Sequence, residues 1–283
     1  MIVSELQEQG YITAVAIEND KKDGESQSLQ RLEQIWTKTP PAAIIIEGGS
    51  QHIEAAIRRS VRPATRVIAT FCDPKSVCRG WHSVQPDLTA ASYLAGAYLI
   101  EKGHRRIGLV LKKPKINLLD NHTDPRRWGS NYTAIDGLND AVEQAGLENV
   151  VSTFISEHSR YPDDTSELTP DELSNVRSAM AWLQTENRVT AVIGQEPWLW
   201  YVKLAASWLK MRIPDDLAVV GIGLANAAYR GEYPCVDWCC RKIANEIVKI
   251  VIADDDELGE VTRHIIVPPK WVDTKIWSAT SNL

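Results

Sequence analysis

The sequence lacks any apolar run long enough to cross a membrane, since a spanning helix needs about 20 consecutive apolar residues. Its first ten residues, MIVSELQEQG, also lack the basic region and apolar core of a signal peptide. We therefore expect no membrane partner. Cysteines are few and odd in number: Cys72, Cys78, Cys235, Cys239 and Cys240. Because they form no regular disulfide framework, they indicate a reducing compartment, and we predict a cytoplasmic protein.

An excess of positive charge is absent as well. The chain has 31 Lys and Arg residues against 37 Asp and Glu residues, for a net charge of −6. A protein that wraps nucleic acid needs a dense basic surface, so we do not expect these residues to bind DNA themselves. Hydrophobic residues make up 44% and charged residues 24%, which is typical of a folded globular protein. At 283 residues, two lobes of roughly 100–150 residues each are expected.

Motifs of hydrolytic and metal chemistry are missing too. The sequence contains no G-x-S-x-G turn and no HExxH helix, so nothing local supports a hydrolase. It has no C-x-x-C pair, and adjacent cysteines such as Cys239 and Cys240 rarely both bind one zinc ion. Gly221 and Gly223 match only the start of a dinucleotide fingerprint, whose third glycine is absent. We predict that the chain is not an enzyme and needs neither metal nor cofactor.

What the sequence does contain is a regular alternation of apolar runs and amphipathic segments. The apolar runs predict strands at residues 10–18, 42–49, 66–71, 107–111, 150–155, 190–194, 217–221 and 264–267. Helical spacing predicts helices at residues 28–38, 51–60, 130–145, 170–185, 199–210 and 241–253. A further helix at residues 90–102 ends at Gly103, followed by a basic turn. This alternation predicts an α/β fold of two Rossmann-like lobes with parallel sheets.

Three segments resemble the effector-binding domain of LacI/GalR transcription regulators. Residues 84–110, VQPDLTAASYLAGAYLIEKGHRRIGLV, are similar to the family's alanine-rich helix followed by GHRRI. Residues 190–223, TAVIGQEPWLWYVKLAASWLKMRIPDDLAVVGIG, are similar to its strand, acidic turn, helix and IPxDxxVVG strand. Residues 265–278, IIVPPKWVDTKIWS, are similar to its closing strand with a proline-proline turn. The order and spacing of all three fit, and the resemblance covers nearly the whole chain.

The resemblance implies a type I periplasmic-binding-protein-like fold with a multi-crossing hinge. It places residues 1–105 and 239–259 in an N-lobe and residues 106–238 and 260–283 in a C-lobe. Gly103, His104 and Arg105 then lie at the first crossing and are expected to form hinge and interlobe contacts. The family's helix-turn-helix headpiece and first core strand have no counterpart here, because residues 3–9 match the tail of the first domain helix. The N-lobe is therefore expected to lack its first strand.

The resemblance also implies a small, sugar-like effector bound between the lobes, at the carboxyl ends of the strands. In the N-lobe, Glu47 and Asp73 follow strands and are expected to accept hydrogen bonds from sugar hydroxyls, although each is equally well an ordinary helix cap. In the C-lobe, Arg126 and its neighbour Arg127 stand where the family has a ligand-binding arginine in an R-x-x-G pattern. The alternative is a solvated surface pair.

Further C-lobe positions depart from the family pattern. Gln195 and Glu196 fall on its asparagine-aspartate pair, whereas Gly223 falls on an aspartate, so the usual hydroxyl ligands are only partly kept. Trp198, at a loop-to-helix junction, is expected to face the cleft, where an aromatic ring stacks on a sugar. Trp200 and Trp208 are expected to pack in the core.

The predicted function is that of a ligand-sensing domain of a LacI-type regulator. Its effector closes the lobes and controls an attached DNA-binding domain, the protein is a homodimer, and operator DNA is a partner only through a headpiece outside this chain. One alternative is the solute-binding protein of a transporter, which requires export. Another is a degenerate dimerisation scaffold that binds nothing, suggested by Gly223 and the missing strand.

Overall fold

The computed structural model describes residues 2–13, 27–47, 51–72, 77–113, 129–148, 150–160, 166–254 and 261–274. The chain forms two compact units, each built from two segments. Unit 1 comprises Met1–Pro86 and Cys240–Val267, and unit 2 comprises Asp87–Cys239 and Pro268–Leu283. The chain therefore passes between the units three times, in agreement with the expected multi-crossing α/β architecture.

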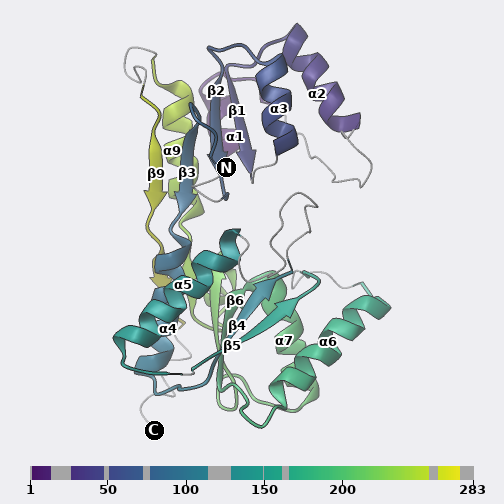
Figure 1. The fold of residues 1–283 in the computed structure, drawn as a ribbon, viewed down its shortest axis with the longest axis vertical. Coiled ribbons are helices and arrows are strands. Elements are labelled where there is room, and N and C mark those ends of the chain that lie inside the picture. Colours follow the sequence, from purple (N-terminus) through teal and green to yellow (C-terminus); the bar gives the residue numbers. More distant parts are fainter. Residues whose placement is uncertain are drawn as a thin grey trace. The chain divides into compact units, whose positions relative to one another are not determined.

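Unit 1 contains a four-stranded parallel sheet in the order β1-β2-β3-β9. Its strands are β1 (Ala43–Glu47), β2 (Arg66–Thr70), β3 (His82–Pro86) and β9 (His264–Val267). Its helices are α1 (Ile2–Glu8), α2 (Gln27–Lys38), α3 (Gln51–Ser60) and α9 (Cys240–Ile252). Within this unit, α2 and α3 lie on one side of the sheet, while α9 lies beside β3 and β9 (Figure 1).

The strand predicted at residues 42–49 is less buried than its apolar run suggests. Only Ile46 of β1 is buried, whereas Ile44 and Ile45 are half-buried. The reason is that β1 is the terminal strand of the described sheet and pairs there with β2 alone. Of the strand predicted at residues 10–18, residues 11–13 are irregular and the rest lie outside the described residues, so the missing first strand stays a prediction.

Unit 2 contains a six-stranded sheet in the order β10-β8-β7-β6-β4-β5. All neighbours are parallel except β10 and β8. Its strands are β4 (Ile107–Lys112), β5 (Val151–Ser156), β6 (Ala191–Gln195), β7 (Ala218–Gly223), β8 (Cys235–Asp237) and β10 (Lys270–Val272). Its helices are α4 (Leu88–Glu101), α5 (Gly129–Gln144), α6 (Pro170–Leu183), α7 (Glu196–Trp208) and α8 (Asn226–Tyr229). Helices α4 and α5 cover one face, and α6 and α7 cover the other (Figure 1).

The position of α4 corrects the predicted first crossing. A Cβ atom at Gly137 of α5 would lie 2.0 Å from the carbonyl oxygen of Thr89, so the two helix backbones nearly touch there. Only glycine permits this approach, and the resulting close packing against α5 places α4 in unit 2. The crossing therefore lies between Pro86 and Asp87, and not near residue 105 as predicted.

The predicted hinge residues are correspondingly internal to unit 2. Gly103, at φ +91°, ends α4 as expected of a left-handed glycine. The Nδ1 atom of His104 lies 3.0 Å from Thr190 Oγ1, and Arg105 donates to the carbonyl of Ile100 at 3.0 Å. Because these contacts join α4 to the amino end of the unit 2 sheet, the hinge assignment of Gly103, His104 and Arg105 is not supported.

The segment 260–283, which was predicted to lie in the C-lobe, is divided between the two units. Strand β9 pairs in parallel with β3, where Val84 stands opposite Ile265, which keeps it in unit 1. After Val267, β10 pairs antiparallel with β8 in unit 2. The third crossing thus lies at the proline-proline turn after β9, whereas the prediction placed it before this strand.

Candidate functional site

The carboxyl edge of the unit 2 sheet is the first place to look for a site. Strands β4, β6 and β7 are parallel and end at Lys112, Gln195 and Gly223, so their last residues meet at one edge. In open α/β sheets, ligands bind outside the carboxyl ends of the strands. The structure has a small cavity at this edge, within unit 2.

The cavity is lined by mostly apolar side chains from separate elements, with a few polar groups among them. Lys112, Gln195, Trp198, Ile222 and Trp238 contribute to its wall, together with residues of α4 and α5. Its volume of about 30 Å³ is small for a ligand pocket.

Trp198 occupies the first turn of α7. This helix begins directly after β6, with Pro197 in its first turn, where a missing N–H costs nothing. The ring of Trp198 is half-buried and lines the cavity, and the Lys112 ammonium lies 5.8 Å from its centroid. A cation at this distance is attracted by the face of the indole. Lys112 and Trp198 therefore form one wall.

The other two tryptophans of this helix differ in burial. Trp200 packs against the core, as predicted, and its ring also lies under the Arg160 guanidinium at 5.1 Å. Trp208 is 45% exposed, so its predicted core position is wrong. It is the last residue of α7, where the helix leaves the covered face of the sheet.

Glu196, predicted to bind a ligand, is engaged within the protein. Its carboxylate forms an ion pair with Arg230 and is only 11% exposed. Arg230 also pairs with Glu232, which Lys203 contacts at 2.8 Å. Hydrogen bonds first to Glu232 and then to Glu196 raise the pKa of Arg230 above its ordinary value. The Glu196 carboxylate therefore belongs to a four-member charge network at the start of α7.

The backbone conformation of Gly223 explains why no side chain stands there. Its φ is +126°, which L side chains rarely adopt, and a Cβ added to it would lie 3.7 Å from the ring of Trp238. The Trp238 backbone N–H also donates to the Gly223 carbonyl at 2.9 Å. An indole therefore faces the position where the resemblance places a ligand-binding aspartate.

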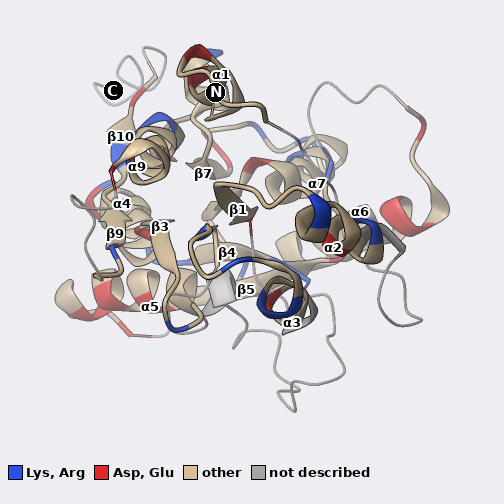
Figure 2. Ribbon diagram, turned by 90° about the horizontal axis from the view of Figure 1, so that it is seen from above, with Lys and Arg blue, Asp and Glu red and all other residues tan. Residues whose placement is uncertain are grey.

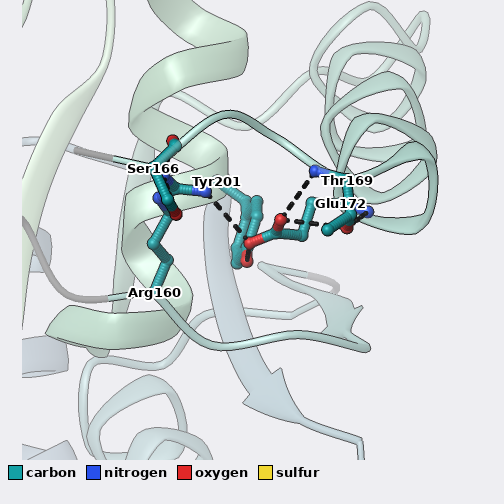
Figure 3. Close-up of polar contacts among 5 residues, drawn as sticks. All are labelled: Arg160, Ser166, Thr169, Glu172 and Tyr201. Atoms are coloured by element: carbon teal, nitrogen blue, oxygen red, sulfur yellow. Dashed lines mark hydrogen bonds and ion pairs between the residues drawn. The ribbon is translucent and has the colours of Figure 1, made fainter. Parts of the chain in front are cut away.

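A polar cluster holds the segment that follows β5 (Figure 3). Arg160, 3% exposed, donates to Glu172 at 3.2 Å and to Ser166 Oγ at 3.0 Å. Glu172 also accepts a hydrogen bond from the Tyr201 hydroxyl at 2.9 Å and from the Thr169 N–H at 2.9 Å. The Thr169 bond is the main reason why the pKa of Glu172 is lowered. The cluster thus joins α6, α7 and this segment through one carboxylate.

This cluster also fixes the start of α7. The backbone N–H of Arg160 donates to the Pro197 carbonyl at 2.9 Å, one residue before Trp198. At the same time, Thr169 caps α6 in a capping box with Glu172. The orientation of Trp198 therefore depends on contacts made well outside the cavity.

The remaining predicted residues are not brought together by the described structure. Glu47 is exposed at the end of β1 in unit 1. Asp73, Arg126 and Arg127 lie outside the described residues. Of the predicted ligand-binding residues, Gln195 and Trp198 line the cavity.

Lys112 and Trp238 were missed by sequence reasoning. Lys112 directly follows the apolar run 107–111, so its place at a strand end was a usable signal. Trp238 follows β8, a three-residue strand without a readable pattern.

The charged surface of the described chain carries both signs (Figure 2). Helix α3 presents basic residues, yet Arg58 pairs with Glu54 at 2.8 Å and Arg59 with Glu33 at 2.7 Å. These acidic partners neutralise the basic side of α3.

Two further properties concern metals and membranes. Among the residues with described positions, no three His, Cys, Asp or Glu side chains are grouped closely enough to hold a metal ion. In the same part of the chain, no helix is both long and apolar enough to span a bilayer.

Comparison with known proteins identifies the fold. Residues 97–274, more than half of the chain, match the family described as periplasmic binding protein-like domain. A LacI family transcriptional regulator from Enterococcus faecium, solved with bound ribose, has a TM-score of 0.70 at 15% identity, covering 96% of this chain and 91% of that one. A LacI transcriptional regulator from a Rhodococcus species has a TM-score of 0.70 at 16% identity, covering 96% and 89%.

A third similar structure is the complex of the transcriptional regulator CelR with cellobiose, with a TM-score of 0.68 at 17% identity, covering 95% of this chain and 75% of that one. A search of curated protein sequences finds no match. The family binds ligands and does not catalyse reactions, in agreement with the predicted absence of enzyme activity. The chain belongs to the periplasmic binding protein-like domain family and has the fold of the effector-binding domains of LacI-family transcriptional regulators.

Proposed function

We propose that this chain is the ligand-sensing domain of a cytoplasmic LacI-type regulator that acts as a homodimer. It binds a small sugar-like effector between its two lobes and controls an attached DNA-binding domain. The observation that carries the proposal is the cavity at the carboxyl edge of the unit 2 sheet, lined by Gln195 and Trp198. Family membership supports it, as do the ribose-bound and cellobiose-bound regulators that share the fold.

The residues at this edge have complementary roles in the proposal. The indole of Trp198 offers a flat face on which the C–H groups of a sugar ring pack. The Gln195 amide both donates to and accepts from hydroxyl groups. The ligand then shifts the equilibrium between lobe arrangements by its differential affinity for them, and the attached domain responds to that shift.

The test is titration calorimetry of the purified chain with monosaccharides and disaccharides, beginning with ribose and cellobiose. Trp198→Ala is expected to weaken sugar binding at least about tenfold, since an aromatic contact of this kind contributes about 1 kcal/mol beyond its buried area. Trp208→Ala is the matched control, because that exposed residue lies on the same helix and outside the cavity. Equal losses in both variants would argue against the proposed site.

Two alternatives remain testable. A solute-binding protein of a transporter would use the same fold. A signal peptide encoded upstream of the Met1 codon would identify such a protein, whereas a helix-turn-helix encoded there would identify the regulator. A scaffold that binds no ligand is favoured by two observations: Gly223 offers no side chain, and the Glu196 carboxylate is occupied by Arg230. An intact dimer that binds no compound of a broad ligand library would establish the scaffold.

A further inference from the structure

Two cysteines that are adjacent in the sequence lie where the chain passes from one unit to the other. The first segment of unit 2 ends at Cys239, and the second segment of unit 1 begins at Cys240. The peptide bond between them is therefore the second passage of the chain between the units. Helix α9 also begins at Cys240, shortly after the end of β8. Both residues carry thiols in the structure.

The backbone at Cys239 has an uncommon conformation. Its φ is +57°, in the left-handed region that residues other than glycine rarely adopt. The Cys239 N–H donates to Asp237 Oδ1 at 2.8 Å, and the Trp238 N–H donates to the Gly223 carbonyl at 2.9 Å. These two hydrogen bonds hold the strained residue and its predecessor in place. Residues in such conformations are concentrated at ligand sites and switch regions.

The two thiols differ in their exposure to solvent. Cys239 is buried, with 9% of its surface exposed, whereas Cys240 is half-buried and within reach of a small reagent. Reversible oxidation of a cysteine needs solvent access and a second thiol nearby that resolves the sulfenic acid. Cys240 meets the first requirement, and the adjacent Cys239 meets the second.

The other three cysteines are placed less favourably for oxidation. Burial is the main cause that raises the pKa of both Cys78 and Cys235 to about 11, so both stay protonated and unreactive at neutral pH. Cys72 Sγ accepts a hydrogen bond from the Gln85 side chain at 3.2 Å. None of the three has another cysteine next to it in the sequence. The adjacent pair is therefore the expected place of reaction.

We propose that Cys239 and Cys240 form a reversible redox site, at which a hydroperoxide converts the two thiols to a disulfide. The Cys240 thiolate attacks the peroxide, the O–O bond breaks, and a sulfenic acid forms while an alcohol or water leaves. The Cys239 thiol then attacks the sulfenic sulfur, an S–S bond forms, and the hydroxyl group leaves as water. Two electrons pass from the cysteines to the peroxide.

Closure of this bond requires movement of the backbone. Consecutive Cα atoms are about 3.8 Å apart, whereas those of bonded cysteines are usually about 4.4–6.8 Å apart. The ring therefore closes with strain, and a strained disulfide is readily reduced. Rotation of the Cys239 backbone also disturbs the hydrogen bonds of Cys239 and Trp238, and Trp238 lines the cavity of unit 2. The oxidation state thus alters one wall of the candidate site.

The test is treatment of the whole folded chain with hydrogen peroxide, followed by alkylation and mass spectrometry. We expect a mass loss of about 2 Da and two fewer alkylated thiols, and reduced glutathione is expected to reverse both changes. Cys239→Ser and Cys240→Ser are each expected to abolish the disulfide. The matched control Cys235→Ala removes the nearest other cysteine in the sequence and is expected to form it normally. Circular dichroism and the Tm establish that the variants are folded.

Two further measurements test the order of the steps and their effect on the cavity wall. Dimedone, which labels sulfenic acids, is expected to label Cys240 in the Cys239→Ser variant. It is not expected to label Cys239 in the Cys240→Ser variant, because Cys239 is buried. In the wild-type chain, oxidation is expected to speed hydrogen exchange at the amides of Trp238 and Cys239 about tenfold, as for loss of one hydrogen bond.

Several results would overturn the inference. These are a disulfide between two copies of the chain, a bond to Cys235, oxidation that glutathione does not reverse, and unchanged exchange at Trp238 after the disulfide has formed. None of these measurements uses a sugar. The redox site therefore stands or falls independently of the sugar-sensing function, which calorimetry tests.

Discussion

The terminal strand β1 of the unit 1 sheet and the central strand β7 of the unit 2 sheet are buried to different degrees. All six residues of β7 in unit 2 are buried, whereas in β1 of unit 1 only Ile46 is. Two helix pairs cover the unit 2 sheet and produce two large core clusters, while the cluster around β1 contains three buried residues. An apolar run therefore predicts a strand but not its burial, which depends on neighbours. The candidate site lies at the ends of the buried central strands of unit 2, and such rigid elements are what a precise site requires.

The largest expected effect comes from the buried charge cluster of unit 2. Arg160→Met removes the guanidinium that contacts Glu172 and is expected to lower the free energy of unfolding by about 4 kcal/mol, as for loss of one partner of a buried pair. Urea unfolding followed by tryptophan fluorescence measures it. The control is Arg58→Met, whose exposed pair with Glu54 is expected to contribute little to stability. Similar losses in both variants would contradict the structural role of Arg160.

Truncation of one isoleucine in each unit tests the comparison directly. Ile193 in β6 is fully buried, so Ile193→Ala is expected to cost about 3 kcal/mol. Ile45 in β1 is half-buried, so Ile45→Ala is expected to cost about 1 kcal/mol. Urea unfolding of both variants gives the ratio of the two losses in unfolding free energy. Equal costs would mean that β1 is covered as fully as β6.

The glycine contact between α4 and α5 is specific to unit 2. Gly137→Ala places a methyl group against the Thr89 carbonyl and is expected to destabilise the protein by about 2 kcal/mol, despite the better helix propensity of alanine. Asp140→Ala, at an exposed position on the same helix, is the control and is expected to change little. A stabilised Gly137→Ala variant would show that the two helices lie farther apart.

The smallest effect concerns pH and one histidine in each unit. Burial is the main cause that lowers the pKa of both His82 and His104, followed by nearby arginines, Arg66 for His82 and Arg105 for His104. The unfolded chain binds protons at these two histidines more readily than the folded chain does. The stability that the neutral histidines contribute is therefore present above about pH 6.5 and is lost as the pH falls through their lowered folded pKa values. The denaturation midpoint is thus expected to fall between pH 7 and pH 5.

In unit 1, the loss has a second source, a hydrogen bond to His82 that protonation of the ring breaks. The Arg263 N–H donates to His82 Nδ1 at 3.1 Å, which needs an unprotonated nitrogen, and more cationic groups act on His82 than on His104. Hydrogen exchange measured for each unit at both pH values checks this difference. A His82→Asn variant is expected to flatten the pH dependence of unit 1, and an unchanged profile would exclude His82 as its source.

Sequence patterns predicted the elements with regular apolar spacing well and those of mixed polarity poorly. The helix at 51–60 and the strand at 264–267 have the predicted bounds, since their apolar spacing or run is clear. Strands β3, β8 and β10 were missed because polar or charged residues interrupt them, and pairing with other strands creates them. Because these strands were missing from the prediction, the predicted crossings between the units were misplaced as well.

The candidate site was predictable to the extent that strand ends reveal it. Gln195 and Trp198 follow an apolar run and could be found from that position. The occupation of Glu196 by Arg230, 34 residues later, has no local signal, because it depends on how α7 and α8 pack. Three further predicted residues, Asp73, Arg126 and Arg127, stay predictions.

The contact between Gly223 and Trp238 limits how the specificity of this site can change. An aspartate introduced at 223 alone would meet both a positive φ and the face of an indole. Exchange of Trp238 alone would leave an empty space beside a glycine. The positive φ at 223 persists whichever residue stands at 238, so even the exchange of both residues would leave an introduced side chain in a strained backbone conformation. A carboxylate at this position therefore also requires a change in the backbone at the end of β7.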